Sequence, residues 1–361
     1  MTGHPHRSLD RRCKTIDQWP AKDRDIWLAA LRAGDVLENG GELSHRSAST
    51  ILEYARGYGR WLTWLDCSGL LDGTVTPANR ITPGRVRDYI QALARYNATI
   101  TILNRLEQLK QASKVMESRQ NWSWIGQIEA SVRVRHQPAR PKRHRVVGIG
   151  ILFDLGVDLM KRAESESTNR RYLMAYRDGL LIALLAARPL RLRNIVTLAL
   201  DRTVVRRGES WWIEIDAAET KTQQPIEMPW PQPLVTHLDY YLSQVRPLLG
   251  TRGRRGTRPA GGDLWLSATD GSPMTRGSVY DLIVERTRAA FGRPINPHLF
   301  RDCAATSIAI DDPLHVGIAS RLLGHHDSST TERHYNQARA VEASRQVQAH
   351  LILLRHSRAG A

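Results

Sequence analysis

Cysteine is scarce in this chain, with three residues among 361: Cys13, Cys67 and Cys303. Their odd number and wide spacing, without a CxxC pair, exclude a disulfide framework and a cysteine-rich zinc site. Such sparse cysteine usage fits a reducing compartment.

Long apolar runs are also missing, and no stretch approaches the ~20 apolar residues that a membrane span requires. The longest uncharged apolar run covers residues 179–187, between Asp178 and Arg188, and predicts a buried helix. The N-terminal residues lack the apolar core of a signal peptide. We therefore expect a soluble, cytoplasmic protein without membrane contact.

Basic residues are abundant, since 52 Lys and Arg face 36 Asp and Glu and give a formal charge of +16. This balance favours a polyanionic partner, although a basic protein that merely stays soluble is the alternative. Residues 133–145 contain no acid, and their two prolines disfavour a helix. We expect this stretch to follow a DNA backbone through its basic side chains: Arg133, Arg135, Arg140, Lys142, Arg143 and Arg145.

The length favours two domains at about 150 residues each. Residues 1–39 are polar and read as an N-terminal tail, whereas residues 40–135 carry helical periodicity, as in Ile51, Tyr54, Tyr58, Leu62 and Leu65. Further helices are expected to start at Thr82-Pro83, and to include 103–109 and 122–132. This pattern predicts a small helical bundle over residues 40–135, followed by a basic linker over residues 136–148.

The second domain, residues 149–361, reads as mainly α with one small sheet, so the whole chain is mainly α (α+β). Helices are expected near 151–163, 169–187, 234–247, 275–290, 297–310 and 313–323. Three short runs separated by turn residues predict a three-stranded antiparallel sheet over 203–205, 211–215 and 225–228.

Four separated segments of this domain hold residues suited to one task. They are the turn Pro189-Leu190-Arg191-Leu192-Arg193-Asn194, the strand connection Glu219-Thr220-Lys221-Thr222, the helix start His298-Leu299-Phe300-Arg301, and Leu323-Gly324-His325 followed by Tyr335. Each is weak alone, because an HxxR pair is usually a solvated helix face. Their order and spacing together are specific.

Through these residues the chain resembles a tyrosine recombinase of the phage integrase family. The motifs carry the resemblance over about 150–340, whereas the residues before that resemble the family only in their length and helical character. The resemblance implies an N-terminal core-binding domain that contacts DNA and a catalytic domain. It makes Arg191 and Arg301 the phosphate-clamping arginines and Lys221 the strand-turn lysine. It also assigns His298 and His325 to the site and Tyr335 as the nucleophile.

The chemistry explains these residue types. Two guanidiniums can hold the non-bridging oxygens of a phosphodiester under attack without a metal. A phenol, with an ordinary pKa of about 10, needs a base or a cationic field, and His298 suits the role of base. Lys221 can protonate the leaving 5′-oxygen. A 3′-phosphotyrosyl ester conserves the bond energy, so we expect no ATP, metal or other cofactor, in keeping with a sequence that has no P-loop.

Three positions depart from the family pattern. Asn194 stands where an acid is usual, so it adds no charge. Arg193 rivals Arg191 as the first clamp residue. Tyr335 lies ten residues after His325, where nine is common, and His334 occupies the usual offset.

The resemblance implies double-stranded DNA as partner, a homotetramer on two DNA sites, accessory DNA-bending proteins and association with the nucleoid. An apolar stripe of Val347, Leu351 and Leu354 is expected to dock on a neighbouring protomer. A type IB topoisomerase, or a catalytically silent DNA-binding relative, is the alternative function. Neither the target DNA sequence nor the type of mobile element follows from these residues.

Overall fold

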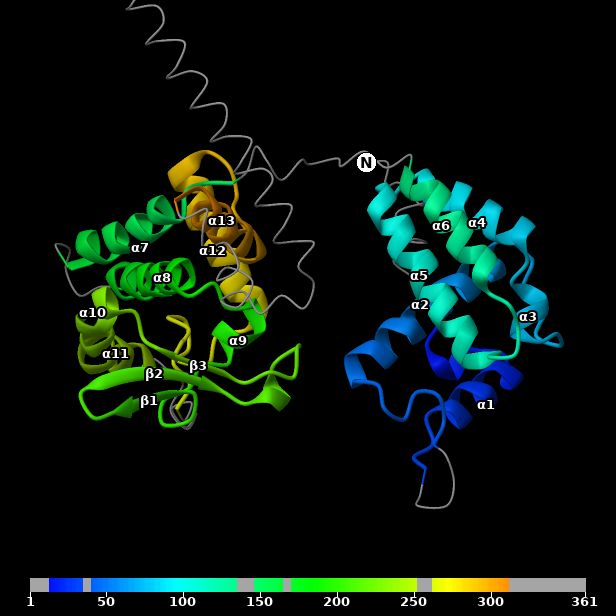
Figure 1. Cartoon of the computed structure of the whole chain (residues 1–361), viewed down its shortest axis with the longest axis horizontal. Coiled ribbons are helices and arrows are strands. Elements are labelled where there is room, and N and C mark those ends of the chain that lie inside the picture. Colours follow the sequence, from blue (N-terminus) through cyan, green and yellow to red (C-terminus); the bar gives the residue numbers. More distant parts are fainter. Residues whose placement is uncertain (1–12, 35–39, 135–145, 165–169, 252–261, 312–361) are drawn as a thin grey trace, which may run out of the picture. The chain divides into compact units, whose positions relative to one another are not determined.

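The computed structural model describes residues 13–34, 40–134, 146–164, 170–251 and 262–311. The chain divides into two compact units, Met1–Pro141 and Lys142–Ala361, and each is described by itself (Figure 1). Within the described ranges no helix is both long and apolar enough to span a bilayer.

The first unit is a helical bundle. Its described elements are the 3₁₀ turn η2 (Ile16–Gln18) and the helices α1 (Ala21–Ala30), α2 (Ala48–Cys67), α3 (Pro77–Arg80), α4 (Pro83–Ala94), α5 (Thr99–Met116) and α6 (Ser123–Val134). The expected helices are confirmed as α2, α4, α5 and α6. The start of α4 is also as predicted, because the Thr82 side chain accepts a hydrogen bond from the Arg85 amide and proline occupies the first turn.

The core of this unit forms where α2 packs against α5. Trp61, Leu62, Leu106 and Leu109 are fully buried there. The helices approach so closely at Gly57 that an added Cβ would lie 2.4 Å from the Gln108 Cβ. Glycine is therefore needed at this crossing.

The structure differs from the predicted tail over residues 1–39, because α1 belongs to the core of the bundle. Trp27 is fully buried. Asp23, also fully buried, forms an ion pair with Arg80 at the end of α3 and accepts a hydrogen bond of 2.7 Å from the Tyr58 hydroxyl. Periodicity missed α1 because a buried ion pair and one tryptophan, rather than an apolar stripe, attach it.

The second unit is mostly helical as well. Its described helices are α7 (Ile149–Glu164), α8 (Arg170–Ala187), α9 (Leu192–Val196), α10 (Val235–Tyr240), α11 (Arg246–Gly250), α12 (Arg276–Phe291) and α13 (Pro297–Asp311). The 3₁₀ turns η4 (Ala217–Glu219) and η5 (Gln232–Leu234) and the π-helical segment η6 (Tyr241–Val245) also belong to this unit, and η6 connects α10 to α11. The buried helix predicted over residues 179–187 is confirmed as the second half of α8.

Helices α7 and α8 run side by side (Figure 1), joined at Gly156 and Gly179. A Cβ on Gly179 would lie 2.5 Å from the Gly156 carbonyl oxygen. Burial on all sides of residues 180–185 makes α8 the centre of the unit's core. The end of α8 is consequently a rigid starting point for the turn that follows.

The predicted antiparallel sheet is confirmed, in the order β1 (Val204–Arg207), β2 (Ser210–Ile215), β3 (Ile226–Pro229). Val204 pairs with Ile213, and Ile213 with Met228. The β1–β2 turn uses Gly208 at a φ of 61°, which glycine adopts without strain. The connection from β2 to β3 holds Lys221.

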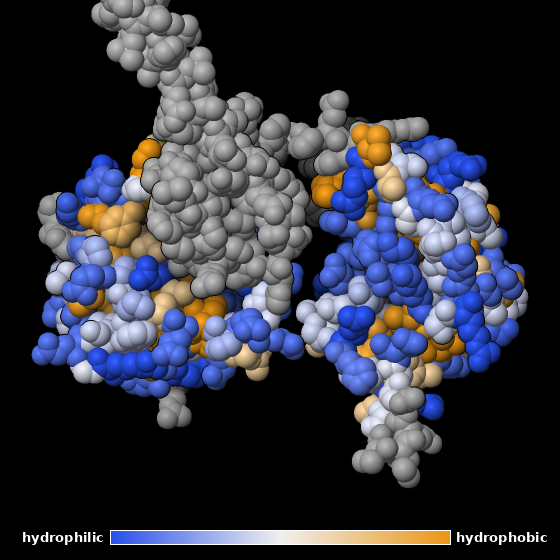
Figure 2. Space-filling model, viewed as in Figure 1, coloured by the Kyte–Doolittle hydropathy of each residue, from blue (hydrophilic) through white to orange (hydrophobic). Residues whose placement is uncertain are grey.

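Hydrophilic residues cover most of the visible face of each unit, with smaller hydrophobic areas between them (Figure 2). The helix predicted over residues 313–323 and the Val347, Leu351 and Leu354 stripe lie outside the described residues.

Candidate active site

The turn after α8 is the centre of the candidate site. Arg191 is the N-cap residue of α9. The Arg301 Nη1 donates a hydrogen bond of 2.5 Å to the Pro189 carbonyl oxygen. This bond joins α13 to the turn, although 112 residues separate the two positions in the sequence.

Arg301 is a buried cation with a second cation near it. Its side chain lies in the core of the unit, at 6% exposure. Burial and, to a smaller extent, the charge of Arg191 lower the pKa of Arg301 to about 10, while Asp302 opposes both effects. Burial and a nearby like charge are both unfavourable for a guanidinium, and an anion bound at this point would oppose both effects.

Arg191 and Arg193 differ in position. Arg191 is half-buried and acts electrostatically on Arg301, whereas Arg193 is exposed on the first turn of α9. The geometry thus favours Arg191 as the partner of Arg301.

Lys221 lies on a compact loop between β2 and β3, with its side chain exposed. It makes no hydrogen bond or ion pair with the described part of the chain. The loop itself is closed by the buried Thr220, whose hydroxyl accepts from the Gln224 amide at 3.1 Å. A free ammonium group on a fixed loop is available to a ligand.

His298 is exposed at the start of α13, one turn before the buried Arg301. Further along this helix, Cys303 and Ser307 attach it to the start of α7 and to the residues just before it. The Val147 amide donates to the Cys303 Sγ at 3.4 Å, and the Ile149 amide donates to the Ser307 Oγ at 3.0 Å. Burial raises the pKa of Cys303 to about 11, so it remains a thiol with a structural role.

Several predicted site residues lie outside the described ranges: His325, Tyr335, Arg135, Arg140, Lys142, Arg143 and Arg145. Arg133 is described and lies exposed in the last turn of α6. The described part of the site therefore consists of Arg191, Lys221, His298 and Arg301.

The sequence did not predict the contacts of two residues at the turn after α8, Arg188 and Asn194. Arg188 donates from Nε and Nη2 to the Pro229 carbonyl oxygen, at 3.2 and 3.1 Å, and so fastens the end of β3 to the turn. Burial lowers its pKa. Asn194 is buried, and its amide nitrogen has no hydrogen-bond partner among the described residues. The sequence signal that could have identified Arg188 is its position as the first charged residue after the long apolar run.

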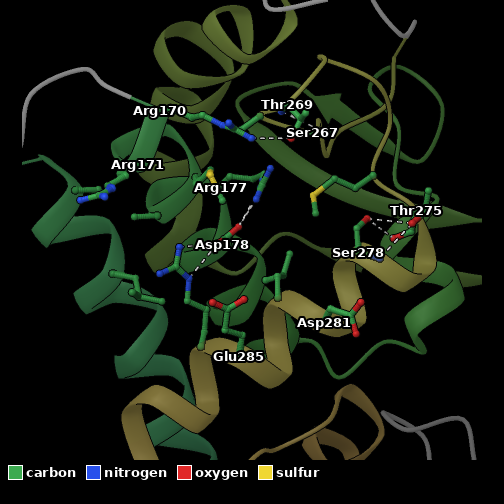
Figure 3. Close-up of a pocket in the computed structure, with 18 of the residues that line it drawn as sticks. Arg170, Arg171, Arg177, Asp178, Ser267, Thr269, Thr275, Ser278, Asp281 and Glu285 are labelled. Carbon is green, nitrogen blue, oxygen red and sulfur yellow. Dashed lines mark hydrogen bonds and ion pairs between the residues drawn. The ribbon is translucent and has the colours of Figure 1, made fainter. Parts of the chain in front are cut away.

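A separate cavity of about 890 Å³ is lined by α7, α8, α12 and the 267–275 loop. Asp178 lies at its base and accepts from both Arg177 and Arg286, at 2.6 and 2.8 Å (Figure 3). These paired charges link α8 to α12, and none of the described site residues Arg191, Lys221, His298 and Arg301 lines the cavity. Across the described ranges, no group of three or more His, Cys, Asp or Glu side chains has the arrangement of a metal site.

Comparison with known proteins agrees with this arrangement. The family model described as "Phage integrase family" matches residues 157–342, which is about half of the chain. The chain belongs to the phage integrase family.

Two curated relatives are tyrosine recombinases named XerD. That of Pseudomonas aeruginosa is 28% identical over 168 residues, covering 46% of this chain and 52% of the relative. That of Mycobacterium tuberculosis is 30% identical over 155 residues, covering 40% and 48%. The matches span about half the length of these relatives.

The fold is shared with a solved structure of the XerH site-specific recombinase bound to its difH substrate in a pre-cleavage complex. That likeness has a TM-score of 0.52 at 14% identity and covers 81% of this chain and 78% of the other. The mainly helical architecture with a small antiparallel sheet is thus that of a known recombinase structure.

Proposed function

We propose that this protein is a site-specific DNA recombinase that cuts and rejoins DNA through a covalent 3′-phosphotyrosyl intermediate. One observation carries the proposal: the buried Arg301 lies under the electrostatic influence of Arg191, so that two guanidinium charges act on each other beside the turn that follows α8. A phosphodiester entering an in-line displacement gains negative charge on its non-bridging oxygens, which fork-shaped donors stabilise.

The remaining steps follow from the residue chemistry. The Tyr335 oxygen attacks the scissile phosphorus and forms the phosphotyrosyl bond, while the bond to the 5′-oxygen breaks. His298 accepts the phenol proton, and Lys221 donates a proton to the leaving 5′-oxygen. Attack of a 5′-hydroxyl on the phosphotyrosyl ester reverses these steps, so that rejoining uses neither ATP nor a metal.

Double-stranded DNA is the proposed partner. The formal charge of +16 supports it, and so does the family of the chain. The fold relative XerH, a site-specific recombinase, was solved bound to a substrate named difH. We extend the proposal to a homotetramer on two DNA sites, aided by accessory DNA-bending proteins, in the nucleoid.

A nicked suicide duplex tests the proposal, because strand loss after cleavage traps the covalent adduct. Tyr335→Phe is expected to bind DNA normally and to form no adduct on a denaturing gel, since only the phenol oxygen becomes bonded to phosphorus. Peptide mapping of the wild-type adduct is expected to locate it at Tyr335, with His334 as the neighbouring alternative. An adduct on another residue, or a 5′-phosphotyrosyl linkage, would overturn the assignment.

A further inference from the structure

Lys221 depends for its position on the backbone of its loop, because its side chain has no partner among the described residues. The loop runs from the end of β2 at Ile215 to the start of β3 at Ile226. A proton donor at the end of a long side chain acts efficiently only when its backbone presents it at one place. The contacts that close this loop are therefore of functional interest.

Thr220, directly before Lys221, supplies those contacts. Its hydroxyl lies 2.8 Å from the Gln224 carbonyl oxygen and 3.0 Å from the Ala217 carbonyl oxygen, and donates its one proton to either. The same oxygen accepts from the Gln224 amide at 3.1 Å. One side chain thus bridges both sides of the segment that contains Lys221.

Burial distinguishes Thr220 from the other polar contacts of the loop. Its side chain is 5% exposed, whereas the nearby ion pair of Arg202 with Glu219 leaves 52% and 37% of those side chains exposed. Exposed ion pairs hold geometry weakly. A buried hydroxyl that satisfies a backbone amide is costly to remove.

The loop also contains a strained residue. Gln223 has a φ of 51°, a left-handed conformation that non-glycine residues seldom adopt. The hydrogen bonds of Thr220 with Gln224, one residue further on, oppose relaxation of this conformation. Without the hydroxyl, the turn is free to open and carry Lys221 away.

We propose that Thr220 is a positioning residue for Lys221, holding the lysine where it protonates the leaving 5′-oxygen. This inference rests on the proposed function. It goes beyond it by assigning a residue that does not touch the substrate and acts only on the proton-donating step.

The test compares Thr220→Val, which keeps the shape and removes the hydroxyl, with Thr220→Ser, which keeps the hydroxyl. Single-turnover cleavage is measured on a normal duplex and on one with a 5′-bridging sulfur, whose leaving thiolate needs no proton. On the normal duplex we expect Thr220→Val to cleave about tenfold more slowly, a part of the ~10²-fold or larger effect of removing the general acid in Lys221→Ala. Thr220→Ser is expected to stay within about twofold of wild type, because it retains the bridging hydroxyl.

On the sulfur duplex, the losses of both Thr220→Val and Lys221→Ala are expected to disappear. Thr203→Val is the matched control, because the buried Thr203 hydroxyl accepts from the Ala199 amide at 2.7 Å in the same unit, a bond that lies outside the loop that holds Lys221. It is expected to lower the melting temperature as Thr220→Val does, without a sulfur-dependent effect on rate.

A Thr220→Val loss that persists on the sulfur duplex, or that Thr220→Ser fails to correct, would overturn this inference alone. Absence of any adduct with wild-type protein on either duplex would instead overturn the proposed function and, with it, this inference. Cleavage by Thr220→Val at the wild-type rate would assign the hydroxyl to stability only.

Discussion

Replacing Arg301 with methionine tests whether burial of this cation destabilises the free protein at the proposed phosphate site. Burial and the Arg191 charge lower the pKa of Arg301 to about 10. Relative to the ordinary arginine pKa, and at ~1.36 kcal/mol per pKa unit, this fall corresponds to about 3 kcal/mol that disfavours the charged form in the folded state. The variant also loses the hydrogen bond to the Pro189 carbonyl, worth ~1 kcal/mol.

The net expectation is that Arg301→Met raises the free energy of unfolding by about 2 kcal/mol. The sign follows from linkage: a basic group with a depressed pKa in the folded state destabilises that state at every pH below the folded value. The effect should therefore be fully present at pH 7 and fade only above about pH 10. The same substitution is expected to slow DNA cleavage by roughly 10²–10³-fold, because it removes a donor to the transition state.

Urea denaturation at pH 7 measures the change, with Arg193→Met as control. Since Arg193 is exposed, its replacement is expected to alter the free energy of unfolding by less than ~0.5 kcal/mol. Inorganic phosphate at ten times its dissociation constant should stabilise wild type by ~1.4 kcal/mol and leave Arg301→Met unaffected. An Arg301→Met protein less stable than wild type would refute the reasoning, because Arg301 would then be neutralised without a bound anion.

Three further predictions concern the linker, the C-terminal residues and α1. Replacing the linker residues Arg140, Lys142, Arg143 and Arg145 with alanine should weaken binding to all DNA sequences alike. In fluorescence anisotropy, the slope of log binding constant against log salt concentration should fall by ~0.9 for each lost phosphate contact, and an unchanged slope would show that these residues do not contact DNA. Deletion of residues 341–361 should abolish strand exchange between two duplexes but preserve single-site binding in gel shifts. Continued recombination by the shortened protein would contradict the docking of these residues on a neighbouring protomer. Asp23→Asn should lower the free energy of unfolding by ~3–5 kcal/mol, because it leaves Arg80 buried without a counter-charge. Asp66→Asn, which breaks a partly exposed pair with Lys14, should cost less than ~1 kcal/mol, and similar losses of the two variants in urea denaturation would refute this.

Periodic sequence features predicted most of the described fold. The apolar face of residues 51–65 became α2, and the run over 179–187 became part of α8, because both helices are attached by apolar burial, which a single sequence displays. Helix α1 was missed because its attachment depends on Asp23 meeting a partner 57 residues away. An ion pair between residues far apart in the sequence leaves no local sequence pattern from which it could be predicted.

The candidate site was predictable in its residue types and less so in its contacts. Motif spacing proposed Arg191 and Arg301, and the structure places them within electrostatic reach of each other. Spacing could not rank Arg191 above Arg193, because that choice depends on which side chain the turn directs inward. Nor could it identify Thr220, whose importance comes from hydrogen bonds to the backbone on both sides of Lys221.

Asn194 connects the stability of the free protein with its chemistry. It occupies a position where the family usually carries an acid, three residues after Arg191, and it is buried. A carboxylate there would add negative charge close in sequence to the clamp arginine, whereas an amide adds none. Among the described groups, the acid that counteracts the lowered pKa of Arg301 is Asp302. The free site is therefore left more positive than one that contains a carboxylate. In the proposed mechanism this charge favours the bound phosphate, as an electrostatically preorganised site requires.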